Sequence, residues 1–478
     1  MSPVGLRESC PGFAGMFPTH AVNGGFGHAF LRRSRAVAML RSRAQKPCSV
    51  LGRSTRILVR CSDANPTERY VVEPASPPND AGDEQLQPVA SASLSQATCW
   101  TLSGMTLKEL ENFVSGMGEK PYRARQLYKW LYRPPVASQV DDMTDLGKLF
   151  REALASSARL HALSLREVRE AQDGTRKLVY QVDGDSPGAV ESVLIPASGR
   201  NTLCISSQLG CAMNCQFCFT GKMGLQRNLT AAEIVDQVTL TKARYESPRQ
   251  ASTQISNIVF MGMGEPFQNL DNVLRALEIL LDPKAMGLSH RKVTVSTSGL
   301  VPEIRRYLRE TSANLAVSLN ATTNEVRNWI MPINRKYPLE VLLETLREEY
   351  ARDARRGDKV FFEYVLLGGV NDSLDDAKRL LRLIAHIPCK VNLIPFNSHA
   401  GSEFRPSPLP QMEAFRQYLH ERGVLVTLRR SRGDDKMAAC GQLGNPGIGR
   451  TPPRMRVPDA FQKVLGTAPL QTRRSAGA

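Results

Sequence analysis

The most regular feature of this chain is the alternation of short apolar runs with helix-length amphipathic segments between residues 201 and 444. Segments such as Ala231–Tyr245 and Leu339–Arg355 carry apolar residues at helical spacing. Six β-α units in series predict a parallel sheet with helices outside it, and six are too few to close an eight-stranded barrel. We therefore expect an α/β fold, an open partial (β/α)6 TIM-like barrel. The expected strands are Thr202–Ser206, Ile258–Met261, Val293–Ser296, Leu315–Leu319, Phe361–Leu366 and Val391–Pro395.

A helical pattern precedes this core, over residues 102–165. Thr106 and Glu109 form a capping-box signature, and Ala124–Tyr132 carries apolar residues at helical spacing until Pro134 follows. One side of that second helix is basic, which is typical both of small RNA-docking domains and of an ordinary solvated face. Residues 166–200 hold two strand-like runs and predict a short β extension.

The two ends of the chain carry most of its net charge of +16. Residues 1–62 hold ten basic residues and a single acid, a composition typical of an organelle transit peptide, although a basic arm that binds nucleic acid has the same character. Val59-Arg60-Cys61 resembles a plastid cleavage site, so we expect the plastid stroma, with the mitochondrial matrix as the alternative. Residues 63–101 predict an acidic, Pro- and Ser-rich linker, and residues 445–478 a disordered basic tail.

Two classes of protein are disfavoured by composition. No run of about 18 apolar residues occurs, so we expect no membrane partner. Ten cysteines in 478 residues are too sparse for a disulfide scaffold.

Three cysteines, Cys211, Cys215 and Cys218, follow the first predicted strand of the core in a C-x3-C-x2-C pattern. Ordinary electron-transfer [4Fe-4S] clusters use four cysteines. Three leave one iron open to a substrate or cofactor, for which S-adenosylmethionine (SAM) is suited when radical chemistry is intended. Zinc prefers four ligands in paired halves, and no second half with that spacing exists here. We therefore expect a [4Fe-4S] cluster that binds SAM.

Small polar residues follow the next strands, where the ligand site of such a sheet lies. Gly262-Met-Gly264-Glu265-Pro266 can approach a ligand closely through its glycines and offers a carboxylate to an ammonium group. Ser296-Thr-Ser-Gly299, Ser318-Leu319-Asn320 and Ile394-Pro-Phe-Asn397 offer hydroxyl, amide and backbone groups. One such cluster is an ordinary turn; this many at successive strand ends indicate a SAM site.

Two further cysteines and one carboxylate stand apart from these motifs. Cys204 lies on the first strand of the core, and Cys440 lies in a polar, glycine-bounded loop where a thiol can be accessible and nucleophilic. Glu191 lies at the start of a strand-like run.

From Leu102 to Leu443 the chain resembles the RlmN/Cfr radical-SAM RNA methyltransferases, and within them the RlmN branch. The resemblance rests on Gly118–Pro121, Ser206–Cys218, Gly262–Pro266, Ser296–Gly299, Ile394–Asn397 and Arg432–Leu443. It implies a radical-SAM barrel with a small helical N-terminal domain that docks RNA. It also implies methylation of C2 of an adenine in 23S rRNA, with a tRNA adenine next to the anticodon as a further substrate in bacteria.

The resemblance also implies residue roles. Cys211, Cys215 and Cys218 hold the cluster, and the SAM contacts are Gly264, Glu265, Ser296, Ser318, Leu319, Asn320 and Asn397. At Asn320 many bacterial relatives carry His, a departure that still leaves a hydrogen-bonding side chain. Cys440 carries the methyl group, Glu191 accepts the C2 proton, and Cys204 attacks Cys440 to form a disulfide, which requires Cα atoms within about 4–7 Å. We expect ferredoxin or flavodoxin as reductant and a monomer.

Three alternatives stay open at this point. The Cfr-type C8 reaction uses the same cluster and cysteines. A catalytically silent RNA-binding or ribosome-assembly factor could keep the fold, although binding alone needs none of these cysteines. A small-molecule radical-SAM enzyme is disfavoured by the helical domain and the basic charge. Arg429, Arg430 and Arg432, just before the Cys440 loop, suit phosphate contacts or a solvated surface equally.

Overall fold

The computed structural model describes residues 99–182, 188–247, 249–352, 359–444 and 452–466. The predicted transit peptide and nearly all of the predicted linker lie outside these residues. The linker was predicted to extend to residue 101, but Trp100–Thr101 form strand β1, which pairs in parallel with β2 (Ala158–Arg159).

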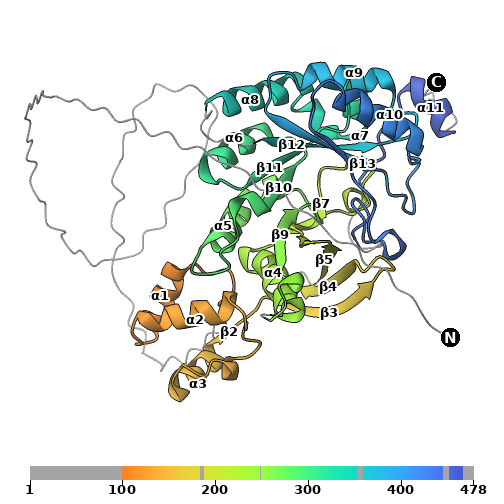
Figure 1. Ribbon diagram of the computed structural model, residues 1–478. Coiled ribbons are helices and arrows are strands. Elements are labelled where there is room, and N and C mark those ends of the chain that lie inside the picture. Colours follow the sequence, from red (N-terminus) through yellow and green to blue (C-terminus); the bar gives the residue numbers. More distant parts are fainter. Residues whose placement is uncertain (1–98, 183–187, 248, 353–358, 445–451, 467–478) are drawn as a thin grey trace, which may run out of the picture. The chain divides into compact units, whose positions relative to one another are not determined.

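One ten-stranded sheet organises the described chain (Figure 1), in the order β14-β13-β12-β11-β10-β9-β6-β5-β4-β3. The strands from β6 to β14 pair in parallel, whereas β3, β4, β5 and β6 pair antiparallel. The terminal strands β3 and β14 do not pair with each other, so the sheet stays open, as predicted. The strands are β3 Leu163–Glu170, β4 Arg176–Val182, β5 Gly188–Ala197, β6 Arg200–Cys204, β9 Ile255–Phe260, β10 Val293–Thr297, β11 Asn314–Ser318, β12 Val360–Leu366, β13 Cys389–Pro395 and β14 Val426–Leu428.

Helices follow the parallel strands and cover the sheet, each neighbour packing on the next from α4 to α5 and α6, and from α9 to α10. Thr230 and Glu233 form a capping box that starts α4, in which the Thr230 hydroxyl accepts from the Glu233 N–H. The buried faces of these helices and both faces of the central strands form a large apolar core, as expected for a parallel sheet, and a second, smaller apolar cluster lies around Trp329 of α7. The helices are α4 Ala231–Tyr245, α5 Leu270–Leu281, α6 Val301–Glu310, α7 Asn324–Ile330, α8 Leu339–Arg352, α9 Leu374–Leu383 and α10 Leu409–His420.

The N-terminal helices are α1 (Leu107–Gly116), α2 (Tyr122–Tyr132) and α3 (Lys148–Ser157). Thr106 and Glu109 form the predicted capping box at the start of α1. The buried carboxylate of Asp236 on α4 accepts from Ser103 Oγ at 2.6 Å and from the N–H groups of Ala162 and Leu163. Asp236 therefore ties the start and the end of the helical domain to the barrel.

The C-terminal segment differs from the prediction of a disordered tail over residues 445–478. Residues 452–466 are described and include α11 (Asp459–Leu465). Phe461 stacks on Trp329 of α7 with ring centroids 5.5 Å apart, and Leu465 is buried beside them. Apolar surface on the barrel thus orders a stretch whose composition alone indicated disorder. No helix in the described part of the chain is long and apolar enough to cross a membrane.

Candidate active site

One cavity at the carboxyl ends of the parallel strands brings nine of the thirteen predicted site residues together. They come from the loop after β7, the ends of β9, β10 and β11, and the loop after β14. Cys204, Glu191, Leu319 and Asn397 do not line this cavity. The nine are Cys211, Cys215, Cys218, Gly264, Glu265, Ser296, Ser318, Asn320 and Cys440.

Cys211 ends β7 (Gln208–Cys211), and Cys215 and Cys218 lie in the connection between β7 and its antiparallel partner β8 (Gly224–Asn228). The strands cross so closely at Gly210, whose φ is +74°, that a Cβ there would lie 1.8 Å from the carbonyl oxygen of Gly224. Only glycine fits this position. The Cys218 N–H donates to the Cys215 carbonyl at 3.1 Å, which curls the loop and turns all three cysteines toward the cavity.

The chemistry of these thiols suits a bound cluster. Burial raises the pKa of all three, and the charges of neighbouring cysteines raise the pKa of Cys211 and Cys215 further. A cationic iron centre would relieve that cost, because thiolates are the form that binds iron. No three Cys, His, Asp or Glu side chains of the described residues converge on one metal-ion position. Thiols that each bind a different iron of a cluster would not converge in that way.

The loop after β9 approaches the cavity through its backbone. Gly264 has a φ of +98°, and a Cβ there would lie 2.5 Å from the Cβ of Gln208. Glu265 is buried, and its two carboxylate oxygens accept from the N–H groups of Phe267 at 3.0 Å and Ser298 at 2.7 Å. Burial raises the pKa of Glu265. A carboxylate held in this way fits the ammonium group of SAM.

Two polar atoms of the cavity wall have no hydrogen-bond partner although they are buried: Ser298 Oγ and Glu363 Oε2. Buried polar atoms normally have partners, so both indicate room for a polar ligand. Glu363 of β12 was missed by the sequence analysis. The available signal was a carboxylate in the middle of the otherwise apolar run Val360–Leu366.

Arg327 of α7 is a second residue that the sequence analysis missed. Its guanidinium is fully buried and donates to the carbonyl oxygens of Ser298 at 2.8 Å, Leu319 at 2.9 Å and Ser318 at 3.0 Å. It thereby holds the strand ends of β10 and β11 together. Its charge also lowers the pKa of Cys215, against the larger effect of burial.

Two of the predicted SAM contacts are asparagines whose side-chain amides make hydrogen bonds within the protein. Asn320 has a φ of +56°, and its side-chain oxygen accepts from the Val365 N–H at 2.8 Å, so much of its amide is already used to join β11 to β12. Asn397 donates from Nδ2 to the Cys440 carbonyl at 3.0 Å and accepts from Ser431 Oγ. Its amide therefore supports the Cys440 loop.

Cys204 lies at the end of β6 and is buried, whereas Cys440 is exposed to the cavity. No disulfide joins any two cysteines of the described chain. Burial raises the pKa of Cys204 to about 12, and the charge of Cys440 contributes to that rise. Incomplete hydration in the cavity raises the pKa of Cys440 to about 11, while the Arg429 guanidinium lowers it. The two thiols are therefore within electrostatic reach of each other.

Glu191 of β5 forms a buried ion pair with Lys177 of β4, with 2.8 Å between Nζ and Oε2. The same oxygen accepts from the Gly444 N–H at 2.9 Å, and Lys177 Nζ also donates to the Met437 carbonyl at 3.1 Å. We call this pair the clasp, because it holds both ends of the segment that carries Cys440. Lys177 was not among the predicted site residues.

The segment after the Cys440 loop returns to the cysteine loop. Asn214 Nδ2 donates to the Pro453 carbonyl at 3.0 Å, and the Met455 N–H donates to Gln216 Oε1 at 3.2 Å. Asn214 and Gln216 lie on either side of Cys215 in the sequence, so residues 452–466 support the outer side of the cysteine loop.

The basic residues along α2 and the arginines just before the Cys440 loop, for which RNA contact and a solvated surface were both left open, are partly engaged within the protein. Directly after α2, the Arg133 guanidinium donates to the carbonyls of Ala285 and Pro283, and on α2 the Arg123 guanidinium donates to the Gln126 side chain and the Asp145 carbonyl. Near the Cys440 loop, a guanidinium nitrogen of Arg429 lies 3.5 Å from Glu363 Oε1, and a guanidinium nitrogen of Arg432 lies 3.8 Å from Asp173 Oδ2. Arg125, Lys129 and Arg430 are exposed.

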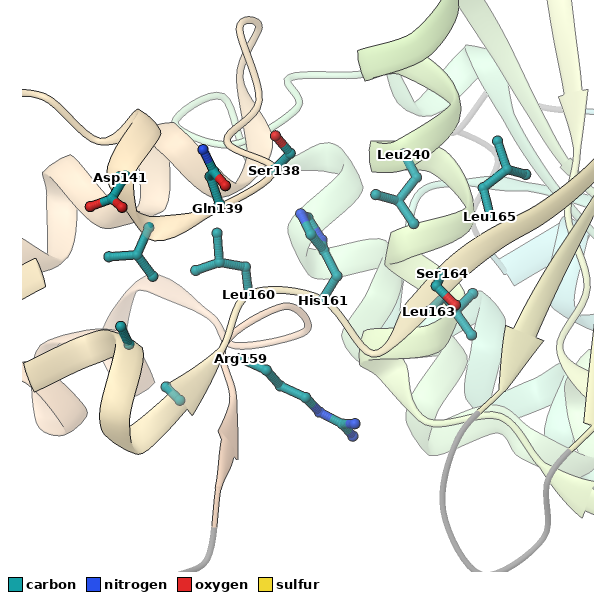
Figure 2. Close-up of a pocket in the computed structure, with 13 residues that line it drawn as sticks. Ser138, Gln139, Asp141, Arg159, Leu160, His161, Leu163, Ser164, Leu165 and Leu240 are labelled. Atoms are coloured by element: carbon teal, nitrogen blue, oxygen red, sulfur yellow. The ribbon is translucent and has the colours of Figure 1, made fainter. Parts of the chain in front are cut away.

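A larger cavity, of about 560 Å³ against about 140 Å³ for the strand-end cavity, lies where the helical domain meets β3 and α4. Figure 2 shows Leu160, Leu163, Leu165 and Leu240 around it, with His161 between the two domains. Both ring nitrogens of His161 are engaged, by Asp236 and the Ala137 carbonyl. No cysteine lines this larger cavity, so the strand-end cavity is taken as the candidate active site because of the residues that line it, although it is smaller.

Comparisons with known proteins agree with the geometry. Residues 100–160 match the family model "Ribosomal RNA large subunit methyltransferase N-terminal domain", and residues 205–384 match "Radical SAM superfamily". The chain is 53% identical over 342 residues to a dual-specificity RNA methyltransferase RlmN of Geobacter sulfurreducens, covering 72% of this chain and 91% of that one. It is 48% identical to the corresponding protein of Syntrophobacter fumaroxidans, covering 71% and 96%.

A solved structure, that of a radical SAM methyltransferase from Sphaerobacter thermophilus, is 42% identical with a TM-score of 0.68, covering 72% of this chain and 98% of that one. The predicted fold class and enzyme class are thus confirmed. This chain belongs to the RlmN family of radical SAM RNA methyltransferases.

Proposed function

We propose that this protein methylates C2 of an adenine in 23S rRNA and carries the transferred carbon on Cys440. The observation that supports this most is that Cys440 lines the same cavity as the three loop cysteines, Gly264 and Glu265. The name of the relatives, dual-specificity RNA methyltransferase, supports an RNA substrate, and we include a tRNA adenine as a second one.

In this proposal Cys211, Cys215 and Cys218 hold a [4Fe-4S] cluster. Bound together, the cluster and SAM supply the radical chemistry that an unreactive C–H carbon such as adenine C2 demands. Glu265 receives the SAM ammonium group. Leu319 and Asn397 do not line the cavity, and they support the residues that do through hydrogen bonds with Arg327 and with the Cys440 carbonyl. The other SAM contacts are Gly264, Ser296, Ser318 and Asn320.

Cys440 first acts as a nucleophile toward SAM. Its thiol loses a proton, Sγ forms a bond to the methyl carbon, and the bond from that carbon to the sulfonium breaks, releasing S-adenosylhomocysteine. Arg429 assists this step, because its positive charge favours the Cys440 thiolate. The exposure of Cys440 to the cavity gives the methyl donor access.

Glu191 and Cys204 act after the carbon has joined the base. Glu191 accepts the C2 proton. The Cys204 thiolate then attacks the Cys440 sulfur, the bond from that sulfur to the transferred carbon breaks with its electron pair going to the adenine, and the carbon takes up a proton to become the methyl group. Oε2 of Glu191 already accepts from Lys177 and Gly444, and Glu191 does not line the cavity. The proton-accepting role therefore requires the Cys440 loop to shift.

Anaerobic reconstitution with separate rRNA and tRNA fragments, read by nucleoside mass spectrometry, tests the proposal. We expect 2-methyladenosine from the wild-type protein and none from Cys440→Ala. 8-Methyladenosine without 2-methyladenosine would favour the Cfr-type reaction. RNA binding without any methylation would favour a silent binding factor. Methylation by Cys440→Ala would refute the role of Cys440.

We further propose that the protein acts in the plastid stroma as a monomer and receives electrons from ferredoxin or flavodoxin. The composition of residues 1–62 supports the location. Residues 1–62 fused to a fluorescent protein should direct it to plastids, and direction to mitochondria would favour the alternative.

A further inference from the structure

Glu363 is a buried carboxylate with one oxygen satisfied and one without a partner. It lies in the middle of β12, opposite Asn392 of β13 in the parallel register. Its Oε1 accepts from Asn392 Nδ2 at 2.8 Å and lies 3.5 Å from the Arg429 guanidinium. Its Oε2 is buried, has no hydrogen-bond partner, and belongs to a residue that lines the strand-end cavity.

Such an oxygen is costly unless something binds it. A buried acceptor without a partner has lost its hydration and gained no hydrogen bond in return, and the loss is larger when the group is charged. Arg429 offsets the charge only in part, because it approaches the other oxygen and its side chain is 42% exposed. The surrounding strand is otherwise apolar, so packing would be better served by a hydrophobic residue.

The neighbours of Glu363 indicate what kind of molecule it meets. Val365 and Ile394 offer an apolar surface in the same cavity, and Ser296 and Ser318 offer hydroxyl groups. An apolar wall with a few hydrogen-bonding groups suits a nucleoside, which has a flat base and a polyhydroxylated sugar. The charge of Glu363 also contributes to the pKa of Cys440, so the carboxylate lies within electrostatic reach of the proposed methyl carrier.

We propose that Oε2 of Glu363 accepts a hydrogen bond from a nucleoside bound in the strand-end cavity, either from a ribose hydroxyl or from an exocyclic amino group. An ionised carboxylate only accepts hydrogen bonds, so the ligand atom must be a donor. Both SAM and the target nucleotide of the RNA carry such donors. The inference rests on the proposed function for the identity of these two ligands.

Glu363→Gln is the sharpest test, because Asn392 distinguishes the two ends of the amide. The Asn392 amino group will hold the glutamine oxygen, which leaves the glutamine amino group where Oε2 was. A donor then faces the ligand's donor. We expect affinity for one ligand to fall about 10- to 100-fold, the range for hydrogen bonds to charged groups.

The measurements use cluster-reconstituted protein under anaerobic conditions. One arm measures the Kd of SAM by calorimetry. The other measures the Kd of an rRNA fragment containing the target adenine and of the same fragment with an abasic site there. A weaker SAM Kd assigns the donor to SAM, and weaker binding of the adenine fragment alone assigns it to the target nucleotide. Unchanged affinity in both arms overturns the proposal.

Glu349→Gln provides the matched control. Glu349 is also a buried glutamate, but it lies on α8, pairs with Arg305 at 3.0 Å and does not line the cavity. It should leave both affinities unchanged. Because every arm reads binding, a failure of the proposed C2 chemistry would not affect the outcome.

If Glu363→Gln does not load the cluster, the wild-type protein still tests the inference. S-Adenosylhomocysteine can be compared with its 2′-deoxy, 3′-deoxy and 6-deamino forms, and the rRNA fragment with one that carries purine at the target position. Loss of one donor should weaken binding about 10-fold or more. If no missing donor weakens binding, the inference is wrong.

Discussion

The most demanding test of how the Cys440 loop is held is to substitute one residue of the clasp alone and then both residues together. Lys177 and Glu191 are 1% and 5% exposed. Lys177→Met leaves the Glu191 carboxylate buried without its counter-ion, and breaking a buried pair in this way costs about 3–5 kcal/mol in free energy of unfolding.

Removing both charges should cost less than removing one. Lys177→Met combined with Glu191→Leu leaves no stranded charge, and replacing a buried pair by apolar residues is often neutral. The Met437 carbonyl and the Gly444 N–H each lose a partner, at about 1 kcal/mol apiece because both residues are only partly buried. We therefore expect the double variant to be more stable than Lys177→Met by about 1–3 kcal/mol.

Two measurements on the cluster-free protein separate stability from loop position. Urea unfolding followed by circular dichroism gives the stability difference. Hydrogen–deuterium exchange of residues 437–444 reports the order of the loop. Both variants should exchange faster there than the wild type, because both lose the hydrogen bond from Lys177 to the Met437 carbonyl and the double variant also loses the one from the Gly444 N–H to Glu191. The double variant thus recovers stability without recovering loop order.

Lys242→Met is the matched control. Lys242 pairs with Glu246 on α4 at 2.7 Å and is also largely buried, but this pair does not contact the Cys440 loop. It should lower stability without changing exchange in residues 437–444. A double variant as unstable as Lys177→Met, or unchanged exchange in both clasp variants, would refute the reasoning.

Three further predictions follow from the site and the domain junction. In the cluster-free protein, the rate of iodoacetamide alkylation of Cys440 should rise about tenfold per pH unit from about pH 8 and level off near its pKa of about 11, because only the thiolate reacts. Arg429→Ala should move the plateau to higher pH, because the Arg429 charge lowers that pKa. A plateau near pH 9 in the wild type would contradict the argument that burial raises the pKa of Cys440. Gly264→Ala should weaken SAM binding more than 10-fold in calorimetry, because the added Cβ meets Gln208 and φ is positive, whereas Gly116→Ala, which meets nothing, should not. Asp236→Asn should lower the free energy of unfolding by about 2–4 kcal/mol and speed proteolysis between α3 and β3, because the carboxylate accepts hydrogen bonds from both ends of the helical domain. An unchanged rate of cleavage would contradict the proposal that Asp236 ties the helical domain to the barrel.

The barrel could be predicted from the sequence because its signals are local. Each central strand is an apolar run, and each helix carries apolar residues at helical spacing. Strand β3 was missed for the complementary reason: it is an edge strand whose side chains are mostly exposed, so Leu163–Glu170 shows no apolar run.

The parts of the site that could not be predicted depend on long-range contacts. Lys177 was not predicted as the partner of Glu191, because the antiparallel register of β4 and β5, with Val179 opposite Glu191, is what brings Lys177 to that carboxylate. Arg327 has no local motif at all, because its partners are carbonyls at the ends of two different strands. Helix α11 has only seven residues and depends on Trp329 for its order.

The contacts of residues 452–466 with Asn214 and Gln216 have a practical consequence for handling the protein. A protease cut near residue 451 would leave the barrel and every proposed catalytic residue intact. It would also uncover the aromatic surface around Trp329 and free the outer side of the cysteine loop. We expect preparations cut there to self-associate and to lose iron faster in air, although they would still contain every residue of the active site.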